Sequence, residues 1–115
     1  MKNNNNSLSE YCILNFNEVF LTLADIVKCK ICDGNISFHK GADRGLGFNV
    51  YVKCSCSEQI LASSPKTNRA FEVNRKFIFV MRLLKMELDG INLFCSLMDI
   101  CSGISKESYY TRKRY

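Results

Sequence analysis

The stretch that decides the fold is residues 29–56, which read CKICDGNISFHKGADRGLGFNVYVKCSC. It begins with the Cys-x-x-Cys pair Cys29 and Cys32 and ends with the Cys-x-Cys pair Cys54 and Cys56. Two close thiol pairs separated by a loop are typical of a tetrahedral zinc site, because each pair forms a tight turn that directs two sulfurs at one ion. The spacing therefore predicts one structural Zn²⁺ held by all four cysteines.

The second pair is one residue shorter than the usual Cys-x-x-Cys, which makes its turn tighter and leaves Cys56 as the least secure ligand. His39, the only histidine, lies between the pairs and is a substitute ligand, although an ordinary exposed residue is the simpler interpretation. Two other readings stay open, a redox pair and plain buried thiols. The redox reading lacks a surrounding βαβ pattern. Cys12, Cys95 and Cys101 lie in apolar stretches and are interpreted as small hydrophobic residues.

The residues between and after the pairs predict a small antiparallel β unit of the zinc-ribbon kind. Phe48, Val50 and Val52 alternate with polar neighbours, which is the period of a half-buried strand. Shorter strands are predicted at 36–38 and 59–61. Ser63-Ser64-Pro65, which holds the only proline, ends the unit.

The N-terminal flank divides into a tail and a helix. Residues 1–9 are Asn-rich and polar, and we expect a disordered tail. Residues 10–27 predict a short amphipathic helix with Val19, Leu23 and Ile26/Val27 on its apolar face. Asn15 or Asn17 can cap it. This helix and the zinc unit together form the predicted domain 10–66.

Residues 67–115 predict a basic three-helix segment. The first helix has an apolar stripe at helical spacing, made of Phe77, Val80, Met81, Leu84 and Leu88. Asp89-Gly90 is expected to end that helix, because glycine supplies the left-handed terminal conformation. A second short stripe consists of Ile91, Phe94, Leu97/Met98 and Cys101.

The end of this segment predicts a helix-turn-helix arrangement. Ser102-Gly103 breaks the second helix, and Ser105 can cap a third with Glu107 in its first turn. Residues 105–114 would then be the recognition helix. The fold class predicted for the whole chain is α+β.

The distribution of charge indicates that the second half of the chain faces a polyanion. The 115 residues carry a net charge of +5. Lys/Arg and Asp/Glu balance in residues 1–60, so the excess lies entirely in 61–115. Duplex DNA is the predicted partner, contacted by basic residues that meet phosphates or base edges. These are Arg75, Arg82, Lys106, Arg112, Lys113 and Arg114. The alternative is a solvated helical surface that binds no nucleic acid.

Catalytic and membrane signatures are missing from the sequence. It has no phosphate-binding loop, no His-Glu-x-x-His and no Gly-x-Ser-x-Gly motif, and one histidine leaves little scope for nucleophilic catalysis. No stretch reads as a signal peptide or a membrane span. We therefore expect an intracellular protein with reduced cysteines, no enzyme activity, no small-molecule substrate and no membrane association.

Several stretches together resemble the N-terminal part of the Mutator-like transposase domain found in many arthropod proteins. Their order and spacing hold from about residue 15 to about residue 110, which is most of the chain. The matching stretches are Asn15-Phe16-Asn17-Glu18, Arg44-Gly45-Leu46-Gly47, Ser63-Ser64-Pro65-Lys66, Val73-Asn74-Arg75-Lys76-Phe77 with Met81-Arg82, Gly90 with Phe94-Cys95-Ser96-Leu97-Met98, and Ser105-Lys106-Glu107-Ser108-Tyr109.

This resemblance implies a transposon-derived fragment with a zinc knuckle and a helical segment. Cys29, Cys32 and Cys54 match the family's metal-ligand pattern, and Cys56 matches with the one-residue shortening. The family's RNase H-like catalytic domain, with its DDE acidic residues, would follow beyond residue 115, so no catalytic residue is carried over. A nuclear location is inferred from the proposed DNA partner and the Arg112-Lys113-Arg114 run.

Two further hypotheses come from other classes. The apolar helices could form a protein-interaction or homo-oligomerisation surface if a neighbouring domain is missing. The chain could also be a decayed fragment without function.

Overall fold

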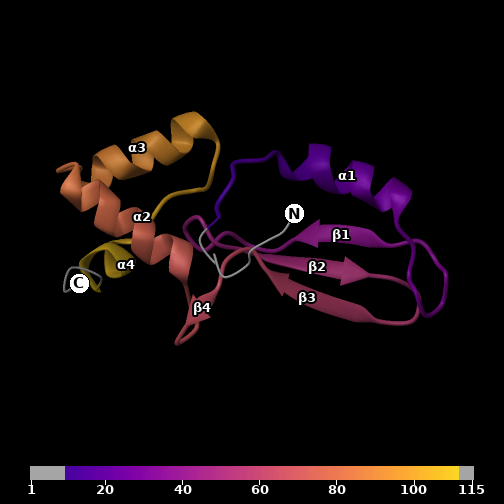
Figure 1. Ribbon diagram of the computed structural model, residues 1–115. Coiled ribbons are helices and arrows are strands. Elements are labelled where there is room, and N and C mark those ends of the chain that lie inside the picture. Colours follow the sequence, from indigo (N-terminus) through magenta and orange to yellow (C-terminus); the bar gives the residue numbers. More distant parts are fainter. Residues whose placement is uncertain (1–9, 112–115) are drawn as a thin grey trace.

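The computed structural model describes residues 10–111, which form an elongated α+β body of 50 × 30 × 25 Å. A three-stranded sheet with one helix beside it forms one half, and three helices form the other (Figure 1). The elements in chain order are α1 (Phe16–Ile26), β1 (Ser37–Lys40), β2 (Asn49–Lys53), β3 (Glu58–Ala62), β4 (Lys66–Thr67), β5 (Ala70–Phe71), α2 (Glu72–Leu83), α3 (Leu88–Met98) and α4 (Lys106–Thr111).

The predicted antiparallel sheet is confirmed. Its strand order is β1-β2-β3, with β2 in the centre. Val50 pairs with Lys40 on β1 and with Leu61 on β3 and is buried, whereas every residue of β3 is exposed. The sheet therefore buries little apolar surface of its own, a marginal arrangement for so few strands.

Helix α1 covers the sheet through aromatic contacts. Asn15 caps it as predicted, since its side chain accepts from the backbone N–H of Glu18 at 2.9 Å. The predicted apolar face is confirmed in part, since Leu23 and Val27 are half-buried. Phe16 lies 6.1 Å from Phe48 and Phe20 lies 5.1 Å from Phe38, ring centre to ring centre. The predicted Val19 and Ile26 are exposed, because the larger aromatic rings occupy the face toward β1.

A short hairpin that the sequence reading missed joins the two halves. Strands β4 and β5 pair antiparallel through a two-residue turn, Asn68-Arg69, and both turn residues have positive φ. Right-handed strand twist favours such turns, and asparagine tolerates that conformation well. The chain then enters α2 directly after Phe71, which is buried.

The helical half has a small core of residues from α2, α3 and the segment around α4. Its buried members are Ile78, Ile91, Ile104 and Tyr109. Phe77, Met81 and Leu88 pack against it as the stripe predicted, but Val80 and Leu84 are exposed. The predicted second stripe is also shifted, because Ile91 and Cys95 are buried while Phe94, Leu97 and Met98 are exposed.

The helix ends differ from the glycine-based prediction. Helix α2 ends at Leu83, and Lys85 with φ 63° takes the left-handed position. The N–H of Met86 then bonds to the carbonyl of Met81 at 2.9 Å, as in a Schellman motif. Gly90 lies inside α3, where the Cβ of any other residue would come 2.8 Å from Met86 Cε. Asp99, not Ser102-Gly103, ends α3. Ser105 does cap α4, accepting from Ser108 N at 3.0 Å.

Two asparagines fix loops onto the helices. Asn74 of α2 is nearly buried; its side-chain amide donates to the Arg44 carbonyl at 2.6 Å and accepts from Leu46 N at 2.7 Å. Asn92 of α3 does the same with Ile104, accepting from its N–H at 2.7 Å and donating to its carbonyl at 3.3 Å. The first clamp holds the sheet half to the helical half.

Asn74→Ala is expected to lower the free energy of unfolding by about 1–3 kcal/mol, because it leaves two backbone groups of the Arg44 turn without their partners. Urea unfolding of the two proteins measures the difference. Asn17→Ala, at an exposed position of α1, is the comparison for a general asparagine effect. Equal stability of wild type and Asn74→Ala would contradict the clamp.

Candidate metal centre

The first cysteine pair lies in a tight turn after α1. The N–H of Cys29 bonds to the carbonyl of Gly34 at 3.0 Å, and the N–H of Asp33 bonds to the carbonyl of Cys29 at 2.8 Å. Asp33 has φ 59°, which reverses the chain. The N–H of Ile31 points at Cys29 Sγ at 3.4 Å. These backbone bonds hold the first pair in one fixed turn.

The second pair lies in the connection between β2 and β3. Lys53 pairs with Glu58, so residues 54–57 form the hairpin loop, closed by a bond from Cys54 N to the Ser57 carbonyl at 3.0 Å. The strands on either side hold this loop in place. The hairpin loop therefore brings the two sulfurs of the short Cys-x-Cys pair together without the knuckle turn of a Cys-x-x-Cys pair.

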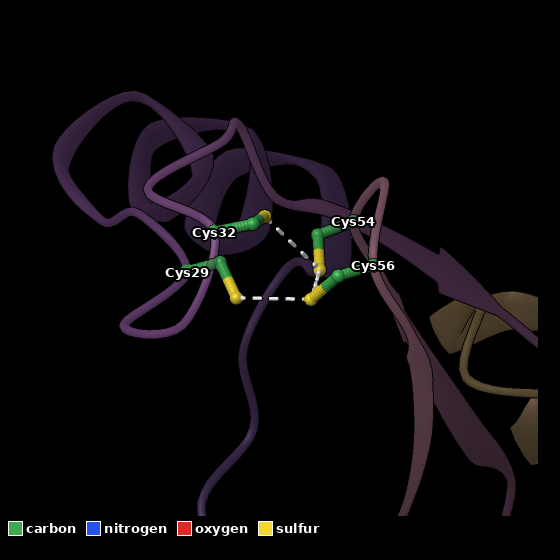
Figure 2. A group of neighbouring side chains, drawn as sticks. All are labelled: Cys29, Cys32, Cys54 and Cys56. Atoms are coloured by element: carbon green, nitrogen blue, oxygen red, sulfur yellow. Dashed lines mark hydrogen bonds between the residues drawn. The ribbon is translucent and has the colours of Figure 1, made fainter.

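The four sulfurs converge on one point (Figure 2). The Sγ atoms of Cys29 and Cys56 are 3.6 Å apart, those of Cys32 and Cys54 are 3.9 Å apart, and those of Cys54 and Cys56 are 3.3 Å apart. All four lie within 4.8 Å of one another. These separations are far longer than a disulfide bond of about 2.05 Å. The four cysteines are thus close enough to hold one metal ion, and Cys56 belongs to the group.

The electrostatics of the cluster favour a cation. The pKa of Cys54 is lowered to about 6, chiefly by the backbone N–H of Cys56. The pKa of Cys56 is raised to about 12, chiefly by the neighbouring Cys54 sulfur. The pKa of Cys32 is lowered, first by the hydroxyl of Ser55, 3.5 Å from its sulfur. The thiols of Cys54 and Cys32 therefore lose their protons more readily than an ordinary cysteine, whereas ionisation of Cys56 is opposed by its neighbours unless a cation lies among them.

Two serines of the hairpin loop are functional candidates that sequence reasoning missed. Ser55 contacts Cys32 Sγ, and Ser57 lies 3.9 Å from Cys54 Sγ and 3.7 Å from Cys56 Sγ. Hydroxyl donors around thiolates orient the ligands of a metal site. Their position inside or beside the Cys-x-Cys pair was the signal that could have identified them.

The predictions for His39 and for the other cysteines have different outcomes. His39 is exposed on β1 and bonds to Ser37 Oγ at 3.1 Å, outside the sulfur cluster. Cys95 is fully buried, as predicted for a small hydrophobic residue. Burial is also the first cause that raises its pKa to about 12. Cys12 is exposed in the segment before α1, so the prediction that it packs as a hydrophobic residue is wrong.

The predicted DNA-contact residues have different environments. Arg75 lies on α2 and Lys106 is exposed on α4. Arg82 packs between α2 and α4, where its guanidinium stacks 4.3 Å from the Tyr109 ring centre and donates to the Tyr109 carbonyl at 3.1 Å. That geometry assigns Arg82 to helix packing. Arg112, Lys113 and Arg114 lie outside the described residues.

Comparisons with known proteins add no relative. No protein-family model, no curated protein and no solved structure matches the chain. The likeness to the Mutator-like transposase domain therefore stays a prediction. Among residues 10–111, no helix has the length and apolar character needed to cross a membrane.

Proposed function

We propose that the chain is a zinc-stabilised, non-enzymatic DNA-binding module of the kind found in transposon-derived proteins. The observation that carries the zinc part is the convergence of the four sulfurs. A tetrahedron with Zn–S bonds of about 2.3 Å has sulfur–sulfur edges of about 3.8 Å. Of the six sulfur–sulfur distances, those of 3.6 and 3.9 Å lie at this value, the one of 3.3 Å lies slightly below it, and all are within 4.8 Å.

The proposed zinc has a structural role, because all four ligand positions are protein thiols and none is open to a substrate. It joins the turn after α1 to the β2–β3 hairpin, at the end of the sheet away from α2, α3 and α4 (Figure 1). Apart from Val50 the sheet buries little, so a metal is the natural source of its stability.

The DNA part of the proposal is supported by charge, by the helical order and by the resemblance. Helices α3 and α4 are joined by a short connection and share the core of Ile91, Ile104 and Tyr109. That order is compatible with a helix-turn-helix unit whose second helix carries Lys106. Arg75 and Lys106 are the described members of the proposed contact set, with the basic run at 112–114 as its continuation.

Binding to duplex DNA is expected to weaken steeply with salt. Lys/Arg contacts to phosphates release counterions, so log K falls with log salt with a slope of about −0.9 per contact. Fluorescence anisotropy with random-sequence duplexes between low and physiological salt measures this slope. Absence of binding at the lowest salt would refute the DNA proposal and leave the zinc proposal intact.

A second candidate, a protein-interaction module, is favoured by apolar side chains on the surface of α2 and α3. Leu83, the last residue of α2, is 66% exposed, Leu84 directly after it is 63% exposed, and Leu97 of α3 is 74% exposed. Light scattering coupled to size exclusion separates the two functions. A stable dimer that ignores DNA would favour interaction, and a monomer that binds DNA would favour the first proposal.

A further inference from the structure

A cavity of about 410 Å³ lies between the two halves of the molecule, away from the sulfur cluster. Three loops meet there: the turn after β1 that contains Arg44, the β4–β5 turn that contains Arg69, and the α3–α4 connection. The polar residues that line it are Asp43, Arg44, Arg69, Asn74, Ser102, Ser105 and Ser108.

The charges of this cavity favour an anion. Arg44 and Arg69 are both exposed. Within residues 10–111, neither guanidinium forms an ion pair with a carboxylate. Asp43, the one acidic residue of the lining, is already paired with Lys40. Two guanidinium groups and three hydroxyls are all hydrogen-bond donors, as the oxygens of a phosphate group require.

The walls of the cavity are held in place before any ligand binds. The Asn74 side chain bonds the Arg44 turn on one side. The Asn92 side chain bonds both backbone groups of Ile104 on the other. A cavity with fixed walls loses little conformational entropy on binding, which favours affinity.

Arg69 occupies a backbone position that its residue type does not favour. Its φ is 69°, a left-handed conformation that glycine or asparagine adopts at less cost. The side chain makes no compensating ion pair with any other residue that the structure describes. A guanidinium kept at a costly turn position beside a cavity is consistent with a ligand-binding role.

We propose that this cavity binds a phosphate group between Arg44 and Arg69. The source of the phosphate is either the backbone of duplex DNA or a small phosphate compound. The DNA arm rests on the proposed function and adds two contacts to it that charge placement in residues 61–115 alone did not identify.

The test uses the full chain with zinc and two single substitutions. Arg69→Gly removes the guanidinium and places at φ 69° the residue that adopts this conformation most readily, so unfolding cannot explain a loss of binding. Arg44→Gln removes the other charge. Lys28→Gln is the matched control, because Lys28 is exposed and is not among the residues that line the cavity.

Two titrations distinguish the sources. With duplex DNA, each arginine variant is expected to lose about tenfold in affinity at low salt and about 0.9 units of salt slope, while Lys28→Gln stays close to wild type on both. With inorganic phosphate followed by NMR, residues around the cavity are expected to shift in wild type and not in Arg69→Gly.

The outcomes separate the two proposals. Suppose that both arginine variants bind DNA as tightly as wild type and that inorganic phosphate shifts no NMR signals. That result would overturn the cavity proposal and leave the DNA-binding proposal standing. Phosphate binding lost in Arg69→Gly without any DNA binding would support the cavity, assign it to a small phosphate compound and refute the DNA proposal. A chain that binds neither refutes both.

Discussion

Cys54→Ser is expected to abolish metal binding and to unfold the sheet half of the protein. Cys54 Sγ lies 3.3 Å from Cys56 Sγ and 3.9 Å from Cys32 Sγ, so its loss leaves an incomplete ligand set. Structural zinc supplies about 10–16 kcal/mol of apparent binding free energy in small zinc domains, which exceeds what a three-stranded sheet with one exposed strand provides. This is the largest effect expected of any single substitution in the chain.

Metal analysis and amide-resolved NMR of the purified, reduced protein measure both consequences. Wild type should contain one zinc per chain, and chelation should reproduce the spectrum of Cys54→Ser. Cys12→Ser is the matched control, since Cys12 is an exposed thiol outside the cluster. A folded, zinc-free Cys54→Ser protein with an intact sheet would contradict the account.

The helical half should respond to Ile78→Ala and not to Val80→Ala. Ile78 is 0% exposed in the core of α2, α3 and α4, whereas Val80 is 44% exposed on α2. Truncating a buried isoleucine costs about 2–5 kcal/mol because a cavity remains, and surface substitutions usually stay within about 0.5 kcal/mol. Total stabilities of about 5–15 kcal/mol make the first change close to the unfolding threshold.

Urea unfolding followed by far-ultraviolet circular dichroism measures the pair on the zinc-loaded protein. The midpoint is expected to fall sharply for Ile78→Ala and to stay near wild type for Val80→Ala. The reverse order would restore the stripe predicted from sequence, with Val80 facing inward, and would contradict the orientation of α2.

Local signals in the sequence predicted the sheet half well. Alternation at Phe48, Val50 and Val52 identifies β2, because a strand with one buried side leaves a period of two in the sequence. The Asn15 and Ser105 caps were also readable, since a short polar side chain before an apolar helix satisfies its free N–H groups.

The orientation of α2 could not be read from the sequence. Residues 77–81 are apolar without interruption, so periodicity does not determine which of them faces inward. Tertiary contacts decide this instead: Asn74 must reach the Arg44 turn, and Ile78 follows one helical turn later on the same face. The helix ends were misread for a related reason, because Lys85 and Asp99 adopt the left-handed conformation expected of glycine.

The two candidate sites differ in how local they are. The sulfur cluster could be predicted because each pair is a short motif in one turn. The cavity could not, because its lining comes from three loops and from the starts of α2 and α4, which meet only in the folded chain. Arg44 also lies in residues 1–60, where basic and acidic residues balance, so the charge distribution did not indicate an anion site there.

X-ray absorption spectroscopy at the zinc edge of the purified protein tests the central claim most directly, because it counts and identifies the ligand atoms. Four sulfurs at about 2.3 Å are predicted, from Cys29, Cys32, Cys54 and Cys56. Three sulfurs and one nitrogen at about 2.0–2.1 Å would mean that His39 replaces Cys56, and a protein that binds no zinc would contradict the metal centre altogether.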